Sequence, residues 1–164
     1  MWFARFAPHL ADDLCLSLVG AVWMAEDGSE ACAYLQEAPA VPMPLGTLVV
    51  RLGQTLALAG EAHGRDTRWH YVVATDVLYE HEEDFNTWYD TEHLPGLAAV
   101  SGVVRATRNR VVEGTGPLYH AGYDLAERDA FNGPAWLVVR GTPWSSRVRP
   151  NFRNTRRTMY RRLA

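Results

Sequence analysis

Apolar and polar residues alternate most regularly in the second half of the chain, and this alternation predicts four β-strands. In residues 69–78, Trp69, Tyr71 and Val73 fall on one face of an extended chain, and the residues between them fall on the other. Valine-rich or alternating segments with glycine or proline at their ends predict the other three strands. These strands are expected at residues 102–113, 118–125 and 153–163.

Residues 82–97 instead follow the period of a helix. Acidic residues open the segment, where they suit the helix dipole, and Phe85, Trp88 and Tyr89 then share one face. Pro95 is expected to end or kink the helix, because proline restricts the residue before it. A second helix is predicted over residues 126–140 with a break at Gly133-Pro134, and a short one opens at Thr142-Pro143.

The first 67 residues are less regular and predict a β-α-β-β order. Residues 1–13 are ambiguous and could make a short helix, whereas the apolar run 14–24 reads as a buried strand. A short helix is expected at residues 29–37. Two strands at 47–52 and 55–61, separated by Gly53-Gln54, suggest a hairpin.

Together the elements predict an α+β fold with an antiparallel sheet. The second part has the order β-α-β-β-α-β of a ferredoxin-like unit, which leaves one sheet face in need of a partner. We therefore expect two segments, a degenerate N-terminal one at 1–67 and the ferredoxin-like domain at 68–164. An α/β barrel would form either by homodimerisation or with the N-terminal segment as a reduced half-repeat, an idea supported by a faint repeat of spacing between residues 2–10 and 144–152.

Composition places the chain among globular proteins and removes several function classes. Hydrophobic residues make up 48% of the 164 residues and charged ones 21%, which is typical of a domain with a core. Because no apolar run is long enough to span a bilayer and the two cysteines lack metal spacing, we expect a cytoplasmic protein without a bound metal. Phosphate-binding glycine loops and the serine-hydrolase motif are also missing from the sequence.

Basic charge is carried by arginine alone and is concentrated at the C-terminal end. The sequence contains no lysine, which excludes any Schiff-base or lysine-nucleophile mechanism. From Arg140 onward there are eight arginines and no acid. Because these arginines alternate with uncharged residues in a strand-like pattern, we expect them to pair with the acidic remainder or to line an anion site; nucleic-acid binding is disfavoured.

Candidate chemistry gathers on the helix at residues 82–97. His93 is expected near the helix C-terminus with Tyr89 one turn behind it and Asp90 three residues back, a setting that favours a raised histidine pKa. These three residues are the candidate catalytic groups, with Asp90 holding the His93 tautomer. The candidate substrate-binding residues are Trp88, Asn86, Tyr71, Arg105 and Arg108. The same aromatic spacing also fits a plain helix–sheet core.

The motif residues resemble a known superfamily. The run Phe85-Asn86-x-Trp88-Tyr89-Asp90-x-Glu92-His93-Leu94-Pro95, followed by Val100-x-Gly102, by Arg105 and Arg108, and by Gly141-Thr142-Pro143-Trp144, resembles the dimeric α/β-barrel superfamily, in particular its EthD-like members. The resemblance covers roughly residues 69–164. It implies a homodimer and a pocket between helix and sheet, in which a histidine, often with a tyrosine, serves as acid or base.

Two classes of function remain open from the sequence. The first is a cofactor-independent enzyme of isomerase, cyclase or monooxygenase type, acting through His93 on a small cyclic or aromatic compound. The second is a non-catalytic ligand-binding or assembly module of the same fold, with haem binding through His93 or His120 as a weaker variant. Both classes of protein would bind a small-molecule ligand, and neither requires a membrane. An enzyme of the first class would also need no cofactor.

Overall fold

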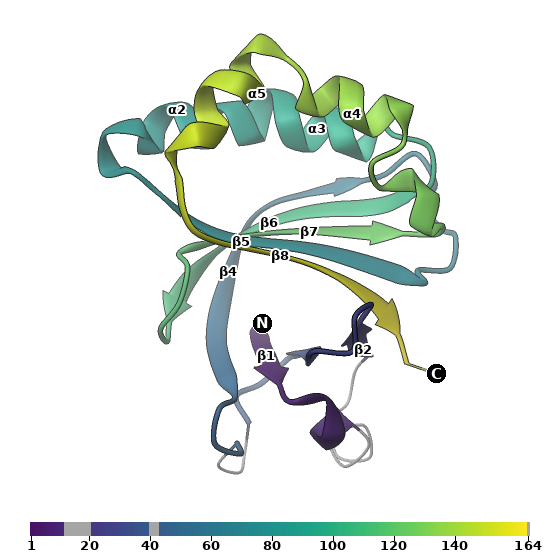
Figure 1. The fold of residues 1–164 in the computed structure, drawn as a ribbon, viewed down its shortest axis with the longest axis vertical. Helices are drawn as coiled ribbons and strands as arrows, with labels where there is room; N and C mark the ends of the chain where they lie inside the picture. The colour runs from purple at the N-terminus through teal and green to yellow at the C-terminus, as the bar shows by residue number, and fades with distance from the viewer. Residues whose placement is uncertain (12–20, 40–42, 164) are drawn as a thin grey trace.

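Eight antiparallel strands form a closed barrel in the computed structural model, which describes residues 1–11, 21–39 and 43–163 (Figure 1). Around the barrel the order is β1-β3-β2-β8-β5-β7-β6-β4. The strands are β1 Trp2–Phe6, β2 Val22–Ala25, β3 Ala31–Leu35, β4 Leu48–Ala59, β5 Trp69–Val77, β6 Val103–Glu113, β7 Tyr119–Leu125 and β8 Phe152–Arg162. This architecture confirms the predicted α+β class, the antiparallel sheet and the barrel.

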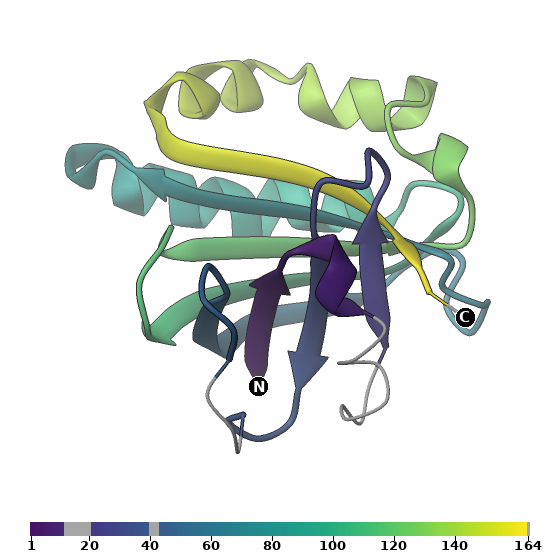
Figure 2. The same cartoon turned by 60° about the horizontal axis from the view of Figure 1, so that its bottom comes forward.

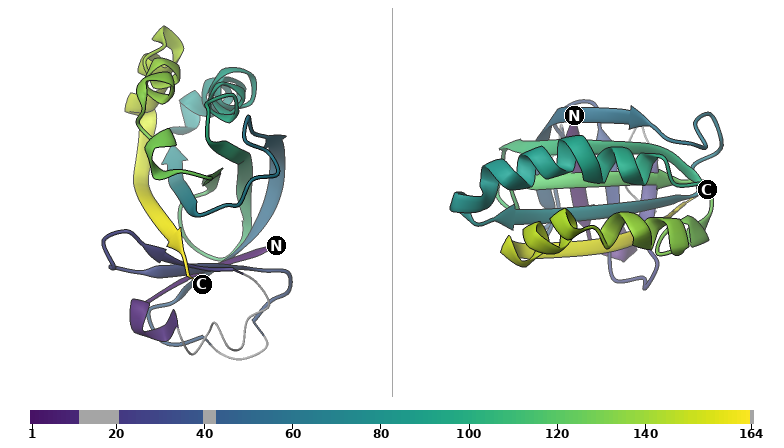
Figure 3. Two further views of the ribbon diagram at one scale, coloured as in Figure 1. Left: turned by 90° about the vertical axis from the view of Figure 1, so that its right-hand side faces the viewer. Right: turned by 90° about the horizontal axis from the view of Figure 1, so that it is seen from above.

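Within the part of the chain that the structure describes, the α-helices α2 to α5 and the π-helical turn between α2 and α3 lie on one side of the sheet. Seen end on, they form two rows above the strands β6, β7, β5 and β8 (Figure 3, left). The N-terminal strands close the barrel on the other side, and Figure 2 shows them in front of the sheet. The helices are α2 Glu82–Trp88, the π-helical η3 Tyr89–His93, α3 Leu94–Ala98, α4 Pro134–Arg140 and α5 Pro143–Val148. No helix among the described residues has the length and apolar character that crossing a membrane requires.

The helix predicted at residues 82–97 is confirmed, but Pro95 does not end it. The chain remains helical through η3 and past Pro95 to Ala98. Pro95 is accepted because it falls in the first turn of α3, after a wider π turn in which the usual hydrogen-bond ladder is already interrupted. The predicted break at Gly133-Pro134 is confirmed, since α4 begins at Pro134.

Several predictions in the N-terminal part are wrong. Residues 2–6 form strand β1, and the helix expected at 29–37 is replaced by strand β3, whose backbone pairs with β1 and β2. The expected hairpin at Gly53-Gln54 is one continuous strand, β4, with bulges beside this dipeptide that turn the chain without reversing it. The strand predicted at 14–24 overlaps β2 at its end, and its earlier part lies outside the described residues.

The chain supplies its own closing strands. β2 pairs with β8 through Trp23 and Arg162, and β1 pairs with β4 through Trp2 and Arg51. β4 therefore joins the N-terminal strands to β6 of the second part. The division at residue 67 and the expected homodimer both stay predictions.

A buried carboxylate ties the closing strands to the main sheet. Glu30, beside β3, is only 6% exposed and accepts hydrogen bonds from Arg156 and from the Tyr160 hydroxyl on β8, the latter at 2.6 Å. Arg5 on β1 lies 3.4 Å from the same carboxylate. Glu30, Arg5, Arg156 and Tyr160 thus form one charged cluster, here called the hub. It connects β1, β3 and β8 at the seam, where the N-terminal strands close the barrel.

Candidate functional site

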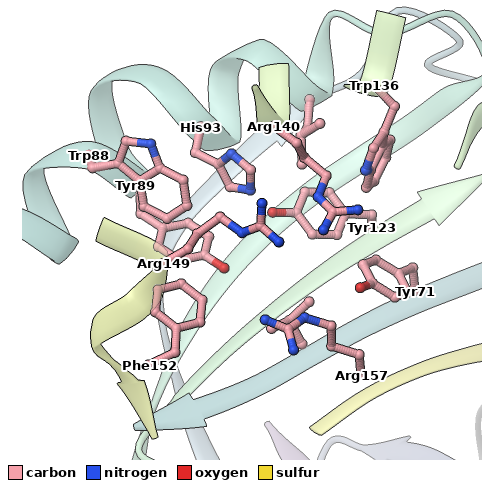
Figure 4. A pocket seen from close by; sticks show the side chains of 12 residues that line it. Tyr71, Trp88, Tyr89, His93, Tyr123, Trp136, Arg140, Arg149, Phe152 and Arg157 are labelled. Carbon is pink, nitrogen blue, oxygen red and sulfur yellow. The ribbon is translucent and has the colours of Figure 1, made fainter. Parts of the chain in front are cut away.

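A small cavity lies between the helices and the sheet, directly below His93 (Figure 4). Its volume is about 30 Å³, room for about two water molecules. Side chains from both helix rows and from strands β5, β7 and β8 enclose it. They are Tyr71, Val73, Trp88, Tyr89, His93, Leu97, Tyr123, Trp136, Arg140, Arg149, Phe152 and Arg157. Four of the predicted site residues, His93, Tyr89, Trp88 and Tyr71, meet here.

His93 is held rigidly but is not hydrogen-bonded at one nitrogen. Its ring stacks on Trp88 with centroids 4.1 Å apart, and the residue is 7% exposed. The buried Nδ1 atom has no hydrogen-bond partner among the described residues. A buried polar atom without a partner carries a desolvation cost, which lowers the stability of the folded protein at this position.

The imidazole of His93 stays neutral at physiological pH. Burial, followed by the positive charges of Arg149 and Arg140, lowers the His93 pKa from 6.5 to about 3. The raised pKa expected from the sequence is therefore wrong, because low solvation and two cations outweigh the helix end, and Asp90 does not contact the ring.

This lowered pKa predicts a loss of stability in acid. Between about pH 6.5 and 3 the unfolded chain protonates His93 while the folded chain does not, so stability falls as pH falls, by at most about 1.4 kcal/mol per pH unit. Replacing His93 with glutamine should flatten the dependence of unfolding free energy on pH in this window. Urea unfolding at pH 7 and pH 4.5 measures the effect, with exposed His63→Gln as the matched control. Equal slopes in both variants would contradict the assignment.

Asp90 does not orient His93, contrary to the prediction. Its carboxylate accepts a hydrogen bond from Arg108 at 2.8 Å. Asn86 accepts a second hydrogen bond from the same guanidinium. The π turn at Tyr89–His93 explains the difference, because a wider turn rotates Asp90 away from the His93 side of the helix.

Arg108 and Arg105 both lie outside the cavity below His93. Arg108 is 3% exposed and sits over the rings of Phe85, Tyr89 and Tyr119 at 4.8–5.2 Å, where two hydrogen bonds and three aromatic faces hold its charge. Arg105 lies three residues back on the opposite face of β6 and donates to Gln54, and both side chains are exposed. The prediction that Asn86, Arg105 and Arg108 bind the ligand of this pocket is therefore not supported by their positions.

Three other arginines take the place expected for Arg105 and Arg108. Arg140, Arg149 and Arg157 line the cavity, and their guanidinium groups point into the same space as the His93 imidazole (Figure 4). Within the described residues none of the three forms an ion pair with a carboxylate; Arg140 donates to the neutral side chain of Asn132. Burial and the charges of its two neighbours lower the pKa of Arg149. Such a like-charge group is unfavourable until an anion neutralises it.

Tyrosines supply neutral donors around this cationic space. Burial raises the pKa of Tyr89 to about 12 and raises those of Tyr71 and Tyr123, so all three hydroxyls remain protonated. The Tyr123 hydroxyl and the Trp136 indole nitrogen are buried without a hydrogen-bond partner among the described residues. Sequence reasoning did not single out Tyr123 or Trp136. The only signals for this part of the site were the alternating pattern of residues 119–125 and the arginine-rich C-terminal end, which contains no acid.

No group of three or more metal-ligating side chains gathers anywhere in the described ranges. No family model and no curated protein sequence matches the chain. The structure, however, is similar to solved proteins over almost its whole length.

Three solved structures illustrate the similarity. An anthrone oxidase-like protein superposes with a TM-score of 0.66 at 13% identity, covering 99% of this chain and 90% of that one. A ferredoxin-fold protein from Listeria monocytogenes, related to antibiotic biosynthesis monooxygenases, gives 0.62 at 12% identity over 100% and 95%. A heme-degrading enzyme from Listeria monocytogenes gives 0.61 at 10% identity over 98% and 99%. At these identities the likeness establishes the ferredoxin-like fold alone.

Proposed function

We propose that the protein binds a small planar or cyclic anion below His93 and catalyses a cofactor-independent proton transfer on it. The observation that carries this proposal is that three arginines, which have no carboxylate partner among the described residues, line one cavity together with the His93 imidazole (Figure 4). The gathered positive charge is unfavourable in the empty protein and is relieved by an anion that accepts hydrogen bonds.

The arginines define the charge of the ligand and the aromatic side chains define its shape. A carboxylate, phenolate or enolate would bridge Arg149 and Arg140, since guanidinium groups pair with such oxygens in two-point contacts. Trp136, Tyr71 and Phe152 would contact a flat or cyclic body. Because the cavity holds only about 30 Å³, the half-buried or exposed arginine side chains must swing outward to admit such a ligand.

His93 would serve as the base once the anion is bound. The ligand's charge would cancel much of the field from Arg149 and Arg140, and the His93 pKa would rise toward the working range of a general base. The imidazole would then accept a proton from an acidic carbon or hydroxyl. The charge that develops on the ligand oxygen would be stabilised by the Tyr123 hydroxyl and the arginines. We place the reaction with the isomerase, cyclase or monooxygenase types and retain EthD-like membership as part of this proposal.

The names of the structural neighbours agree with the ligand class. The anthrone oxidase-like protein and the protein related to antibiotic biosynthesis monooxygenases carry names that refer to aromatic or oxygenation chemistry. They support the choice of cyclic or aromatic compounds for testing.

A non-catalytic binding module is the second candidate, and one observation favours it. A His93 pKa of about 3 makes the imidazole a weak base unless the ligand changes it. In that case the same cavity would store or sense an anion, and His93 would contribute only a hydrogen bond. Binding without proton exchange would identify this function.

Haem does not fit the histidines suggested for it. An axial ligand needs a slot as wide as the macrocycle beside the imidazole, but the cavity at His93 measures about 30 Å³ and that at His120 about 10 Å³. His120 is also enclosed by Phe3, whose ring centroid lies 5.4 Å away.

Arginine 149 should be required for anion binding. Arg149→Gln is expected to weaken binding of benzoate at least about tenfold, the equivalent of losing one charge-assisted hydrogen bond, and to leave binding of uncharged benzamide unchanged. Arg147→Gln is the matched control, because Arg147 pairs with Asp84 outside the cavity. Isothermal titration calorimetry measures both affinities. Similar losses in the two variants would place the anion elsewhere.

Proton exchange separates the two candidate functions. The wild-type protein is expected to accelerate deuterium incorporation next to the ketone of 4-oxocyclohexanecarboxylate, and His93→Ala should abolish the acceleration. Proton NMR in deuterium oxide follows the exchange, and a thermal melt shows whether the variant remains folded. Benzoate binding without any exchange would establish the binding module instead of the enzyme.

A further inference from the structure

A second and larger cavity lies inside the barrel, on the opposite side of the sheet from His93. Its volume is about 220 Å³, and it opens between the closing strands and the main sheet. The residues that line it are Met1, Ala21, Trp23, Tyr34, Gln54, His70, Arg105, Thr107 and Asp124. None of them lines the cavity below His93.

Three of these side chains form a continuous chain of hydrogen bonds. The Nδ1 atom of His70 lies 2.7 Å from Asp124 Oδ1, and its Nε2 atom lies 2.8 Å from the Tyr34 hydroxyl. An ionised carboxylate only accepts, so Nδ1 carries the imidazole proton and donates to Asp124. In the neutral ring Nε2 then accepts from the Tyr34 hydroxyl. This order of hydroxyl, imidazole and carboxylate is that of the serine-hydrolase triad with tyrosine as the hydroxyl.

The fold fixes this chain from three strands. His70 on β5 and Asp124 on β7 are direct partners across the antiparallel ladder. Gly122 leaves room for the imidazole, because a Cβ atom at that position would lie 3.1 Å from His70 Cε1. Tyr34 comes from β3, a closing strand, and Trp23 from β2 packs on the His70 ring with centroids 5.2 Å apart. The constellation therefore exists only when the barrel is closed.

We propose that this cavity is a second small-molecule site, in which the Tyr34–His70–Asp124 chain accepts a proton from a phenol or enol hydroxyl of the ligand. The ligand O–H bond breaks, and its proton passes to the Tyr34 oxygen. The Tyr34 proton moves at the same time to His70 Nε2. The products are a bound ligand anion and an imidazolium, which the Asp124 carboxylate stabilises; no oxidant or cofactor takes part.

Further lining residues define the rest of the ligand. The Trp23 side chain offers an aromatic face, and Thr107 and Gln54 offer hydrogen bonds. Arg105 donates to Gln54 at 3.1 Å and has no carboxylate partner within the described residues. A hydroxylated aromatic ring with an anionic substituent at Arg105 matches this arrangement. Burial raises the pKa of the Tyr34 hydroxyl, so that it is protonated before the ligand binds.

A chromogenic phenol tests the proposal. The probe is 4-hydroxy-3-nitrobenzoate, whose phenolate absorbs visible light, used below the pH at which the free probe ionises. The wild-type protein should show the phenolate band on binding, whereas Tyr34→Phe and Asp124→Asn should lose it. His63→Gln should retain the band, since His63 is exposed and lines neither cavity. If Tyr34→Phe and Asp124→Asn both keep the band, the proposal is overturned.

Further variants control for misfolding and for the orientation of the probe in the cavity. Asp124 is 26% exposed at its side chain, so Asp124→Asn decides the outcome if Tyr34→Phe does not fold. Arg105→Gln should weaken binding of the probe about tenfold, a difference of about 1.4 kcal/mol, and leave that of its uncharged amide unchanged. A purely structural hydrogen-bond chain would change thermal stability in Asp124→Asn without changing the ionisation of the bound probe, and that result also overturns the proposal.

Discussion

Replacing Trp88 with alanine is expected to lower the free energy of unfolding by about 3–5 kcal/mol. The residue is 1% exposed and packs between Tyr89, Phe152 and the His93 ring. Its indole nitrogen also donates to Glu92 at 3.2 Å. Alanine would remove the largest side chain of α2 and leave a cavity that its neighbours, which include two rings in edge-on contact, cannot fill without moving.

Urea denaturation at pH 7 measures this loss. Trp144→Ala is the matched control, because Trp144 is only half-buried on α5 and should cost much less. If Trp88→Ala and Trp144→Ala destabilise the protein equally and slightly, Trp88 is a movable wall of the cavity and not part of the core. A large loss of unfolding free energy in Trp88→Ala alone would show that Trp88 holds the His93 ring rigidly.

The second large effect is expected at the barrel seam, where Glu30→Gln should cost about 2–3 kcal/mol. Glutamine keeps the shape of the side chain but removes the charge that Arg156 and Arg5 share. Since the side chains of these arginines are 47% and 28% exposed, water recovers part of their solvation and limits the loss. The Tyr160 hydroxyl can still donate to the amide oxygen.

Urea denaturation compares Glu30→Gln with Glu113→Gln. Glu113 pairs with Arg51 at 3.0 Å on the surface, where removing the charge should cost well under 1 kcal/mol. Hydrogen exchange should also become faster in β2 and β3 than in β5 and β7, because the hub joins the closing strands to β8. Equal stability losses, or exchange that rises uniformly, would show that closure does not depend on this carboxylate.

The second half of the fold could be predicted because its signals are strong and local. Residues 69–77 alternate between two sheet faces, and Phe85, Trp88 and Tyr89 recur at helical spacing. The N-terminal strands are short, and their apolar residues do not separate helix from strand. Residues 31–35 form β3 because their backbone pairs with β1 on one side and β2 on the other. These pairings are tertiary contacts that the local sequence does not indicate.

The helix pattern indicated where the candidate site lies, but not which side chains its residues contact. His93 and Tyr89 were found from the helix pattern, but the π turn that directs Asp90 to Arg108 leaves no clear mark in the sequence. The arginine-rich tail predicted either pairing with the acidic remainder or an anion site, and which arginines remain without carboxylates depends on tertiary pairing. The same holds for Tyr34, His70 and Asp124, which lie far apart in sequence and meet only through strand register.

The central claim, that an anion binds beside His93, is tested most directly by the pKa of this histidine. NMR of the imidazole as a function of pH should give a value near 3 for the free protein. Saturating benzoate should raise it by more than one unit, because a carboxylate cancels the field of Arg149 and Arg140. Benzamide should leave it unchanged. A His93 pKa that is the same with and without benzoate would contradict the account.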